Sequence, residues 1–470
     1  MASGAEDESK REPSGLDSTT AQELKKHAAA HLWPHWARER TDGRGDLRII
    51  TRGEGCWVFD EAGRKYLDVR AGGVCAVHCG HGRQEIAQAV YDQIMRLAFF
   101  KEDGFAHAPA IQLAHAIAQI APPGLSRVFL TSTGTEAVET TLKLARQYWR
   151  IRLGHGRKMK ILAREGAYHG ATYGAMSATG MQWRRELFEP LVPGFVHIKK
   201  PACHSCQCDK STRVGMACIR DFEQAVEAED HETVAAIICD PIMVAGGVII
   251  PPAPYYRALR DLCDEKEILL IFDEVISGFG RTGEWFAGSH WGVVPDMIAC
   301  AKGVSSGYIP LGAAIVQERL YAAFADDRNP LGGFRHGYTY GGHPVACAAG
   351  LANLEILRRE RLVERAKAMG SMLLQGLESL RDIPLVRDIR GVGLLVGVEV
   401  GESPTGGAGG TKQTAALGQR ISEALLRRGV ICRVPSNVLA ICPPLIITEE
   451  EVTFAIGAVR EALIEVGTGN

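Results

Sequence analysis

The sequence predicts an α/β protein with a mainly parallel sheet, and two observations support this fold class. Short apolar runs alternate with amphipathic stretches through the middle of the 470-residue chain, an order typical of strand–helix–strand units. Several runs are apolar throughout, as strands covered on both faces are. We expect strands at residues 128–130, 160–163, 234–239, 268–272, 297–301 and 313–316, with helices between them, such as 136–150 and 254–265.

The two ends of the chain follow a different pattern and predict a smaller α+β domain. Residues 47–69 alternate as a small antiparallel meander does. After about residue 351, a long helical stretch leads to another strand and then to a glycine-rich loop. We expect a disordered tail at 1–20, a small domain built from 21–77 together with 351–470, and a large domain, 78–350, inserted between them.

The composition argues against several classes of function. Hydrophobic residues make up 46% of the chain and charged residues 23%, and the formal net charge is −2. This nearly neutral balance gives no reason to expect nucleic acid or an anionic membrane surface as a partner. No apolar run reaches the roughly 18 residues of a membrane span, and the N-terminus lacks the apolar core of a secretory signal. We expect a cytoplasmic protein that acts on small molecules.

The chain has thirteen cysteines, and most lie singly in apolar stretches, so we expect buried reduced thiols. One group is different: Cys203, Cys206, Cys208 and Cys218 lie close together, with His204 beside them. The CxxC spacing is typical of zinc sites, but no second CxxC or HxxxH completes one. We therefore expect no metal, and the role of this loop stays open.

Two chemically useful residues follow strands in the predicted sheet. Asp273 ends a buried strand and precedes a glycine-rich loop, and about thirty residues later Lys302 follows a second strand. Ligands of open α/β sheets bind at the carboxyl edge, where both side chains should meet. A carboxylate there can hold a pyridine nitrogen protonated, and a lysine can form a Schiff base. Taken singly, a salt-bridged acid and an exposed lysine are equally good interpretations.

A phosphate site is predicted where the strand FLTST runs through small residues into a helix. The backbone N–H groups at the start of that helix, with the hydroxyl of Thr135, suit an anion. An ordinary helix cap is the alternative, with Thr133 as the N-cap and Glu136 completing a capping box. The two interpretations are compatible. A third segment, GAYHGATYG, places Tyr168 after a strand, where its ring could stack on an aromatic ligand.

Together these segments resemble the class III aminotransferases of the fold-type I pyridoxal-phosphate enzymes. The resemblance runs from about residue 32 to about residue 465. Its most specific pieces are DEVISGFGRTG, AKGVSSGYIPLGA, STGTEAVE, AYHG and HGYTYGGHPVACA. It implies a large domain with a mainly parallel sheet of seven strands, a smaller α+β domain from both termini, and pyridoxal 5′-phosphate as cofactor.

The resemblance also implies roles for individual residues. Lys302 would carry the cofactor and move the substrate proton, and Asp273 would pair with its pyridine nitrogen. The remaining contacts would come from both faces of the ring and from the phosphate. They are Val275 and Tyr168 on the ring, Gly134 and Thr135 on the phosphate, and Thr339 on the phosphate of a neighbouring subunit. A homodimer with shared active sites follows from this last role.

Departures from the family pattern narrow the expected substrate. Ala440 and Ala245 stand where the ornithine and 4-aminobutyrate branch carries an arginine and its gating glutamate. Arg433 instead lies ten residues before Pro443, which resembles the mobile arginine of the ω-amine–pyruvate aminotransferases. A guanidinium binds a carboxylate through two parallel hydrogen bonds, so we expect Arg433 to bind the keto acid. A solvated surface arginine is the alternative.

Two further departures concern the pocket. Val74 aligns with the tryptophan that forms a pocket wall in some ω-aminotransferases, which suggests room for a bulkier or differently shaped amine. Asp240 replaces the family's glutamate before Pro241 and is one methylene shorter. We expect a ping-pong reaction in which a primary amine or ω-amino compound donates its amino group to a keto acid, most simply pyruvate. The sequence does not identify the donor.

Three other functions are alternatives to this one. The glycines at 278–283 spell the GxGxxG pattern of dinucleotide-binding enzymes, with Asp296 as an acid further on, but a lone match is weak. A catalytically inactive binding protein of the same fold would not be expected to keep both Lys302 and Asp273. Decarboxylation-dependent transamination resembles this chain broadly, but such enzymes favour glutamine at the position of Val275.

Overall fold

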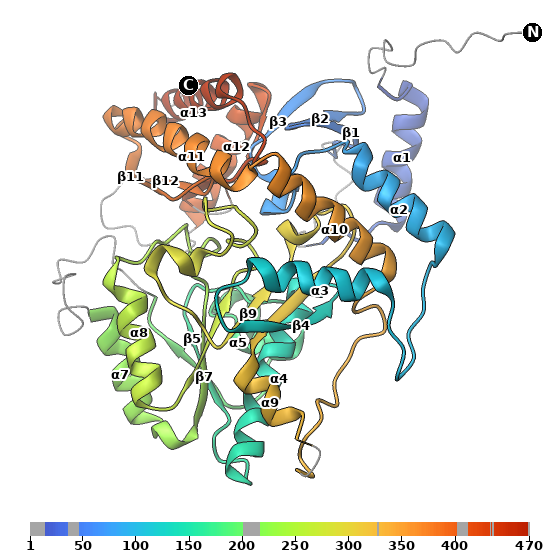
Figure 1. Ribbon diagram of the computed structural model, residues 1–470. Helices are drawn as coiled ribbons and strands as arrows, with labels where there is room; N and C mark the ends of the chain where they lie inside the picture. Colours follow the sequence, from blue (N-terminus) through green and yellow to red (C-terminus); the bar gives the residue numbers. More distant parts are fainter. Residues whose placement is uncertain are drawn as a thin grey trace, which may run out of the picture.

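The computed structural model describes residues 15–35, 47–200, 217–326, 329–401, 412–432, 434 and 437–468. A large sheet with its helices forms one end of the molecule (Figure 1). The C-terminal helices, drawn in orange and red, lie at the other end, beside the first strands, drawn in blue. Segments from the two ends of the chain therefore lie close together in space.

The central sheet has seven strands in the order β4-β10-β9-β8-β7-β5-β6. β10 is antiparallel to both of its neighbours, and the other neighbouring pairs are parallel. The predicted α/β class is confirmed, all six predicted runs form strands, and β6 is the added one. The strands are β4 (Leu125–Thr131), β5 (Lys160–Arg164), β6 (Phe195–Ile198), β7 (Val234–Cys239), β8 (Leu269–Asp273), β9 (Met297–Cys300) and β10 (Gly312–Gln317).

The two helices predicted at 136–150 and 254–265 are present as α4 and α8. Among the described residues, no helix is long and apolar enough to cross a membrane. The α-helices are α1 (Ser18–His31), α2 (Gln84–Arg96), α3 (Ala108–Ile120), α4 (Gly134–Leu153), α5 (Tyr173–Ala178), α6 (Gln182–Arg185), α7 (Ala217–Ala228), α8 (Pro254–Glu265), α9 (Glu318–Phe324), α10 (Pro344–Arg359), α11 (Leu362–Glu378), α12 (Lys412–Arg427) and α13 (Glu449–Thr468).

Both faces of the central sheet are buried, which explains the uninterrupted apolar runs. Successive side chains of a strand point to opposite faces. In β7, Ile237 packs in the core formed with α7 and α8, whereas its neighbour Ile238 packs in the core formed with α4. Leu270 and Ile271 of β8 divide in the same way. A strand that is covered on both faces has no solvent-facing side for alternating polar residues. Polar residues that could bind a ligand therefore stand at the ends of such strands.

The ends of the chain form two small sheets. The predicted meander is present as β1 (Ile50–Glu54), β2 (Trp57–Asp60) and β3 (Lys65–Asp68), and the C-terminal strand β13 (Val430–Ile431) pairs with β3 in parallel. The second sheet contains β11 (Val386–Gly391), β12 (Val396–Val400) and β14 (Val438–Ile441). The β3–β13 pairing joins both termini in one sheet. The domain boundaries at 77/78 and 350/351 stay a prediction.

The N-terminal helix begins earlier than the predicted tail allowed. α1 starts at Ser18, and the backbone N–H of Thr20 donates a 2.9 Å hydrogen bond to Oδ1 of Asp17. This carboxylate satisfies one of the donors that a helix start leaves without a partner. Residues 18–20 are thus helical, so the predicted disordered tail does not extend to residue 20.

One prediction about the cysteines was wrong. Cys75 and Cys442 form a disulfide that joins positions 367 residues apart. Eight other described cysteines are free and buried, as expected. The two bonded sulfurs meet because the segment after β3 passes directly beside the segment after β14, a proximity that no sequence pattern indicates. Cys203, Cys206 and Cys208 lie outside the described residues.

Candidate active site

Asp273 is fixed at the carboxyl end of β8 by groups on both of its oxygens. The backbone N–H of Val275 donates to Oδ1 at 3.1 Å, and Nδ1 of His169 lies 2.8 Å from Oδ2. The carboxylate is buried. Because both oxygens are already bonded from the protein side, the orientation of this acid is set before any ligand binds.

The acid next in the chain serves the loop instead of the ligand. Glu274 is fully buried and accepts hydrogen bonds from Ser277 Oγ at 2.7 Å, from Ala287 N–H at 2.8 Å and from Gly288 N–H at 3.0 Å. Burial raises the pKa of Glu274 to about 7. The Asp-Glu pair of the sequence thus divides into one residue for the site and one for the fold of the loop.

Lys302 follows β9, the strand parallel to β8, and begins a single 3₁₀ turn. Its backbone φ is +44°, a left-handed conformation that is strained for a residue with a Cβ and that gathers at functional sites. Burial lowers the pKa of its amine to about 8, against the attraction of Asp273 and Asp240. The amine is therefore easier to deprotonate than an exposed lysine.

His169 connects two carboxylates in the floor of the site. Its Nδ1 lies 2.8 Å from Asp273 Oδ2 and 3.3 Å from Asp240 Oδ1. Burial opposes a charge on His169, but Asp240 and Asp273 outweigh it and raise the pKa of the imidazole. Burial also raises the pKa of Asp240 to about 7. No sequence pattern indicated that Asp240 shares this contact.

The N-terminus of α4 points toward the same region. Thr133 caps the helix by accepting from the N–H of Glu136 at 3.1 Å, and the carboxylate of Glu136 accepts from Ser132 N–H at 2.7 Å. A Cβ at Gly134 would lie 2.8 Å from Val275, so a larger residue here would push into the loop after Asp273. The capping interpretation is confirmed, and the helix start lies directly beside Val275.

Tyr168 comes from the segment between β5 and α5, which also contacts α4. A Cβ at Gly170 would lie 2.7 Å from the hydroxyl of Thr135, and the φ of Gly170 is +145°. The guanidinium of Arg184, from α6, lies 5.1 Å from the centre of the Tyr168 ring, within the range of a cation–π contact. The predicted ring-stacking and phosphate-binding segments therefore pack against each other.

Three other predicted residues have different outcomes. Val74 lies in the short turn Ala71–Cys75, with 59% of its surface exposed. Thr339 is exposed on the segment before α10. Arg433 lies outside the described residues. His336 and His343 also form hydrogen bonds: Nε2 of the first lies 3.2 Å from Thr140 Oγ1, and Nδ1 of the second accepts from Val345 N–H at 3.2 Å.

The dinucleotide interpretation of the glycines at 278–283 has no structural basis. That pattern needs a helix opening directly after the glycines. Here the segment after β8 continues as turns, and the next α-helix is α9, which begins at Glu318. The glycines instead let the chain pass close to its neighbours: a Cβ at Gly278 would lie 2.9 Å from the carbonyl oxygen of Glu274.

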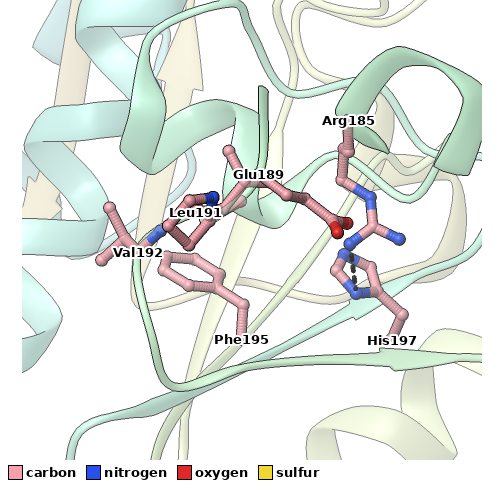
Figure 2. Close-up of a pocket in the computed structure, with 8 residues that line it drawn as sticks. Arg185, Glu189, Leu191, Val192, Phe195 and His197 are labelled. Atoms are coloured by element: carbon pink, nitrogen blue, oxygen red, sulfur yellow. Dashed lines mark hydrogen bonds between the residues drawn. The ribbon is translucent and has the colours of Figure 1, made fainter. Parts of the chain in front are cut away.

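A separate hollow of about 440 Å³ lies between α6 and β6 (Figure 2). Arg185 and His197 meet there, with Nη1 of the first 3.2 Å from Nδ1 of the second, and the side chain of Glu189 points toward both. Burial and then the charge of Arg185 lower the pKa of His197 to about 4. His197 therefore stays neutral near pH 7.

Comparison with known proteins decides the family. A model described as aminotransferase class III matches residues 41–463. The chain belongs to the class III aminotransferases. A probable aminotransferase of Mycobacterium tuberculosis is 41% identical over 93% of each chain. Putrescine–pyruvate aminotransferase of Pseudomonas aeruginosa is 38% identical over 92% of this chain and 94% of its own.

Solved structures agree with this assignment. A thermostable (S)-enantioselective ω-transaminase from Thermomicrobium roseum is 40% identical, with a TM-score of 0.89 over 95% of this chain and 99% of that one. The ω-transaminase of Pseudomonas jessenii in complex with PMP is 34% identical, with a TM-score of 0.90 over 95% and 98%. This aminotransferase uses pyridoxal 5′-phosphate, the cofactor of its class.

The residues of this chain fit that cofactor. A buried carboxylate, a half-buried lysine and a helix N-terminus converge, as a pyridine nitrogen, an aldehyde and a phosphate require. Nε2 of His169 and Oδ1 of Asp240 are buried and have no hydrogen-bond partner among the described residues. Oxygen and nitrogen atoms of His169, Asp240 and Asp273 lie within 4.8 Å of one another. A metal could be held at that spacing, but the family's cofactor accounts for these groups without one.

Proposed function

We propose that this aminotransferase transfers an amino group from a primary amine or ω-amino compound to pyruvate by a ping-pong reaction. The observation that carries the proposal is the pair of neighbouring parallel strands that end in Asp273 and lead into Lys302. Asp273 is buried and Lys302 is half-buried at the carboxyl edge of the sheet, which is where ligands of open α/β sheets bind.

Each predicted cofactor residue has a role in this proposal. Lys302 forms the covalent link, and Asp273 holds the pyridine nitrogen in its protonated form. Val275 and Tyr168 pack on opposite faces of the ring, and the N–H groups of α4, with Gly134 and Thr135, bind the phosphate. The close packing of Gly134 on Val275, and of Gly170 on Thr135, supports one shared binding site.

In the proposed reaction, the cofactor supplies an electron sink for the carbon that bears the transferred nitrogen. Lys302 removes the proton from that carbon once the substrate amine has displaced it. Its lowered pKa, about 8, leaves a usable fraction of the amine uncharged near neutral pH. Asp273 keeps its negative charge directed at the ring nitrogen throughout. In the second half-reaction, Lys302 returns the proton to the carbon derived from the keto acid.

Pyruvate is proposed as the acceptor on two grounds. Relatives that span most of this chain are named putrescine–pyruvate aminotransferase and, at 34% identity, taurine–pyruvate aminotransferase. Arg433 stands ten residues before Pro443 and supplies a guanidinium for the acceptor carboxylate. Ala440, on β14, and Ala245 offer no charge that could take its place.

The donor pocket is proposed to admit bulky amines, because its wall carries Val74. A Pseudomonas jessenii ω-transaminase was engineered for bulky amines with a glycine in place of a tryptophan. Val74 is a natural change of the same kind, from the tryptophan of some ω-aminotransferases to a smaller side chain. The exposed side chain of Val74 leaves this wall open to a substrate.

Assembly as a homodimer completes the proposal. The segment at 338–343 lies against the segment at 99–107: the rings of Tyr340 and Phe99 are 5.6 Å apart, and His107 Nε2 lies 2.9 Å from the carbonyl oxygen of Gly342. Thr339 is exposed on the segment at 338–343. Several large apolar side chains are exposed on or near it: Tyr91, Ile94, Met95, Phe99, Phe100, Phe105 and Tyr340. An apolar surface of this extent suits a second copy of the chain.

The test is a donor panel with pyruvate as the fixed acceptor. The holoenzyme is mixed with β-alanine, taurine, diamines and bulky amines, and alanine formation is measured. We expect alanine with at least one donor that lacks a carboxylate beside the amine. Release of carbon dioxide with a dialkylglycine would indicate the decarboxylating reaction instead. A holoenzyme that forms no alanine with any donor, while forming glutamate from 2-oxoglutarate, would contradict pyruvate as acceptor.

A further inference from the structure

We propose that Asp240 is a positioning residue for the cofactor, because it forms with His169 a proton-sharing pair directly behind Asp273. This inference rests on the proposed function, in which Asp273 holds the pyridine nitrogen. In this inference, the charge on the Asp240–His169 pair changes the visible absorption of the bound cofactor. Asp240 itself takes no part in the reaction.

The geometry places one imidazole N–H between two carboxylates. Nδ1 of His169 lies 2.8 Å from Asp273 and 3.3 Å from Asp240. The N–H can donate fully to only one of them, and the shorter distance assigns it to Asp273. Oδ1 of Asp240 is then buried without a hydrogen-bond donor among the described residues. A buried carboxylate without a donor is costly as an anion, so the pair gains by binding a further proton.

The cluster is largely shielded from water. His169 is 3% exposed, and the side chain of Asp240 is 12% exposed. Burial raises the pKa of Asp240 to about 7, and repulsion from the Asp273 carboxylate adds to this effect, against the attraction of His169. Ionisation of Asp240 above that pH adds a second negative charge close to Asp273, since an oxygen of each side chain lies within 4.8 Å of the other. The pair therefore titrates within the working range of the enzyme.

Every charged group that faces this pair comes from a neighbouring strand end. Asp273, on β8, and Lys302, after β9, act on Asp240, which follows β7. His197, on β6, faces His169 from the other side and is neutral near pH 7. The Cys239 thiol is adjacent, but burial raises its pKa well above the ordinary value, so it carries no charge. Asp240 is thus an acid of this cluster whose pKa burial raises to about 7.

The shorter acid makes this pairing a property of this chain. The family's glutamate before Pro241 has one more methylene than Asp240, so its carboxylate would extend past the imidazole. With aspartate, the carboxylate stops at His169, and the Tyr256 hydroxyl donates to the Asp240 backbone carbonyl at 2.8 Å instead of to the side chain. The side chain is thereby left to His169.

The experiment follows the visible absorption of the bound cofactor in the holoenzyme from pH 5.5 to 9, without substrate. Five variants are compared: Asp240→Asn, Asp240→Glu, His169→Asn, the double variant Asp240→Asn/His169→Asn and, as a matched control, Asp264→Asn, at an exposed acid of α8 that pairs with Arg260. Cofactor dissociation constants are measured for each. Thermal unfolding checks that the variants are folded.

We expect the wild type and Asp264→Asn to show an absorption change with a midpoint near pH 7. Asp240→Asn and His169→Asn should lose this change, and Asp240→Glu should keep it with a displaced midpoint. Each neutral variant should weaken cofactor binding by roughly tenfold. The double variant should be no weaker than either single one within about threefold, because both changes break one pair.

Several results would overturn the inference. An unchanged midpoint in folded Asp240→Asn would assign the titration to Lys302. Losses that multiply in the double variant would mean that the two residues act separately. If Asp240→Asn does not bind the cofactor, Asp240→Glu decides: a midpoint identical to wild type contradicts the pairing. A wild-type protein that binds cofactor and transaminates without any transition would refute this inference alone, whereas one that binds no cofactor would refute the proposed function.

Discussion

Asp273 receives hydrogen bonds from Val275 N–H and from His169, one on each carboxylate oxygen. This arrangement fixes the acid where its charge can act on one ligand atom. Asp273→Asn removes the charge but keeps the shape. We expect a loss of roughly 10³-fold in turnover, because a neutral amide no longer favours a protonated ring nitrogen. The measurement is steady-state turnover with saturating cofactor, with Asp264→Asn as control. Near-native turnover would show that the proposed cofactor orientation is wrong.

Arg433 is proposed to act in only one of the two half-reactions. Its charge-assisted contact with a carboxylate is worth about 1.5–3 kcal/mol, or roughly ten- to a hundredfold. Arg433→Ala should therefore raise the apparent KM for pyruvate by that factor. The half-reaction with a donor that lacks a carboxylate should change little. Stopped-flow absorbance separates the two halves, and Arg427→Ala, at an exposed ion pair with Glu465, is the control. Equal damage to both halves would mean that Arg433 is structural.

The sequence could indicate some site residues and not others for a physical reason. Asp273 and Lys302 stand at the ends of apolar runs, and the carboxyl edge of a parallel sheet brings such ends together. Asp240 also ends such a run, but its contact with His169 depends on a side-chain length and on a loop path. A distance of 3.3 Å between residues 71 positions apart has no counterpart in a sequence pattern.

At the scale of elements, the turn that carries Val74 is tied to the C-terminal segment by several bonds. The N–H of Cys442 donates to the Val69 carbonyl at 2.8 Å, Arg70 Nη1 donates to the Ala440 carbonyl at 3.0 Å, and Cys75 is bonded to Cys442. The turn that carries Val74 and the segment that leads to Pro443 are therefore bonded to each other at three points. These bonds join the two ends of the chain beside the active site.

The disulfide should contribute to stability through the unfolded chain, where it closes a loop of 367 residues. Cys442→Ala should lower the free energy of unfolding by roughly 2–5 kcal/mol under oxidising conditions. Reductant should destabilise the wild type similarly and leave this variant unchanged. Urea unfolding with and without dithiothreitol measures both effects. Cys432→Ala, at a free buried cysteine nearby, should keep the response to reductant. A wild type insensitive to reductant would contradict a formed disulfide.

The sequence did not predict the strands that are defined by tertiary contacts instead of by a local pattern. Six apolar runs gave six strands because burial on both faces demands uniform apolar residues. β6 (Phe195–Ile198) is an edge strand that includes His197, so its four residues did not stand out. β13 has two residues and is a strand because β3 lies beside it. Such strands are set by their neighbours.

For the whole molecule, the proposed shared active site requires two copies of the chain. Exposed apolar side chains lie on α2, on 99–107 and on 338–343, the segment that contains Thr339. Phe100→Asp places a charge on this surface and should convert the dimer to a monomer, with loss of most activity, because Thr339 is proposed to serve the neighbouring site. Light scattering after size exclusion measures the mass. Leu187→Asp, at an exposed leucine outside this surface, should leave mass and activity unchanged. A fully active monomer would refute the shared site.

The central claim is that Lys302 carries the cofactor, and one measurement addresses it directly. Borohydride makes the bond between a lysine amine and the cofactor aldehyde permanent, and peptide mapping then locates the labelled residue. We expect one labelled peptide, which contains Lys302 in the segment after β9. Lys302→Ala should give no label while still binding the cofactor non-covalently, since the phosphate and ring contacts come from other residues. A stoichiometric label on any other lysine would contradict the account.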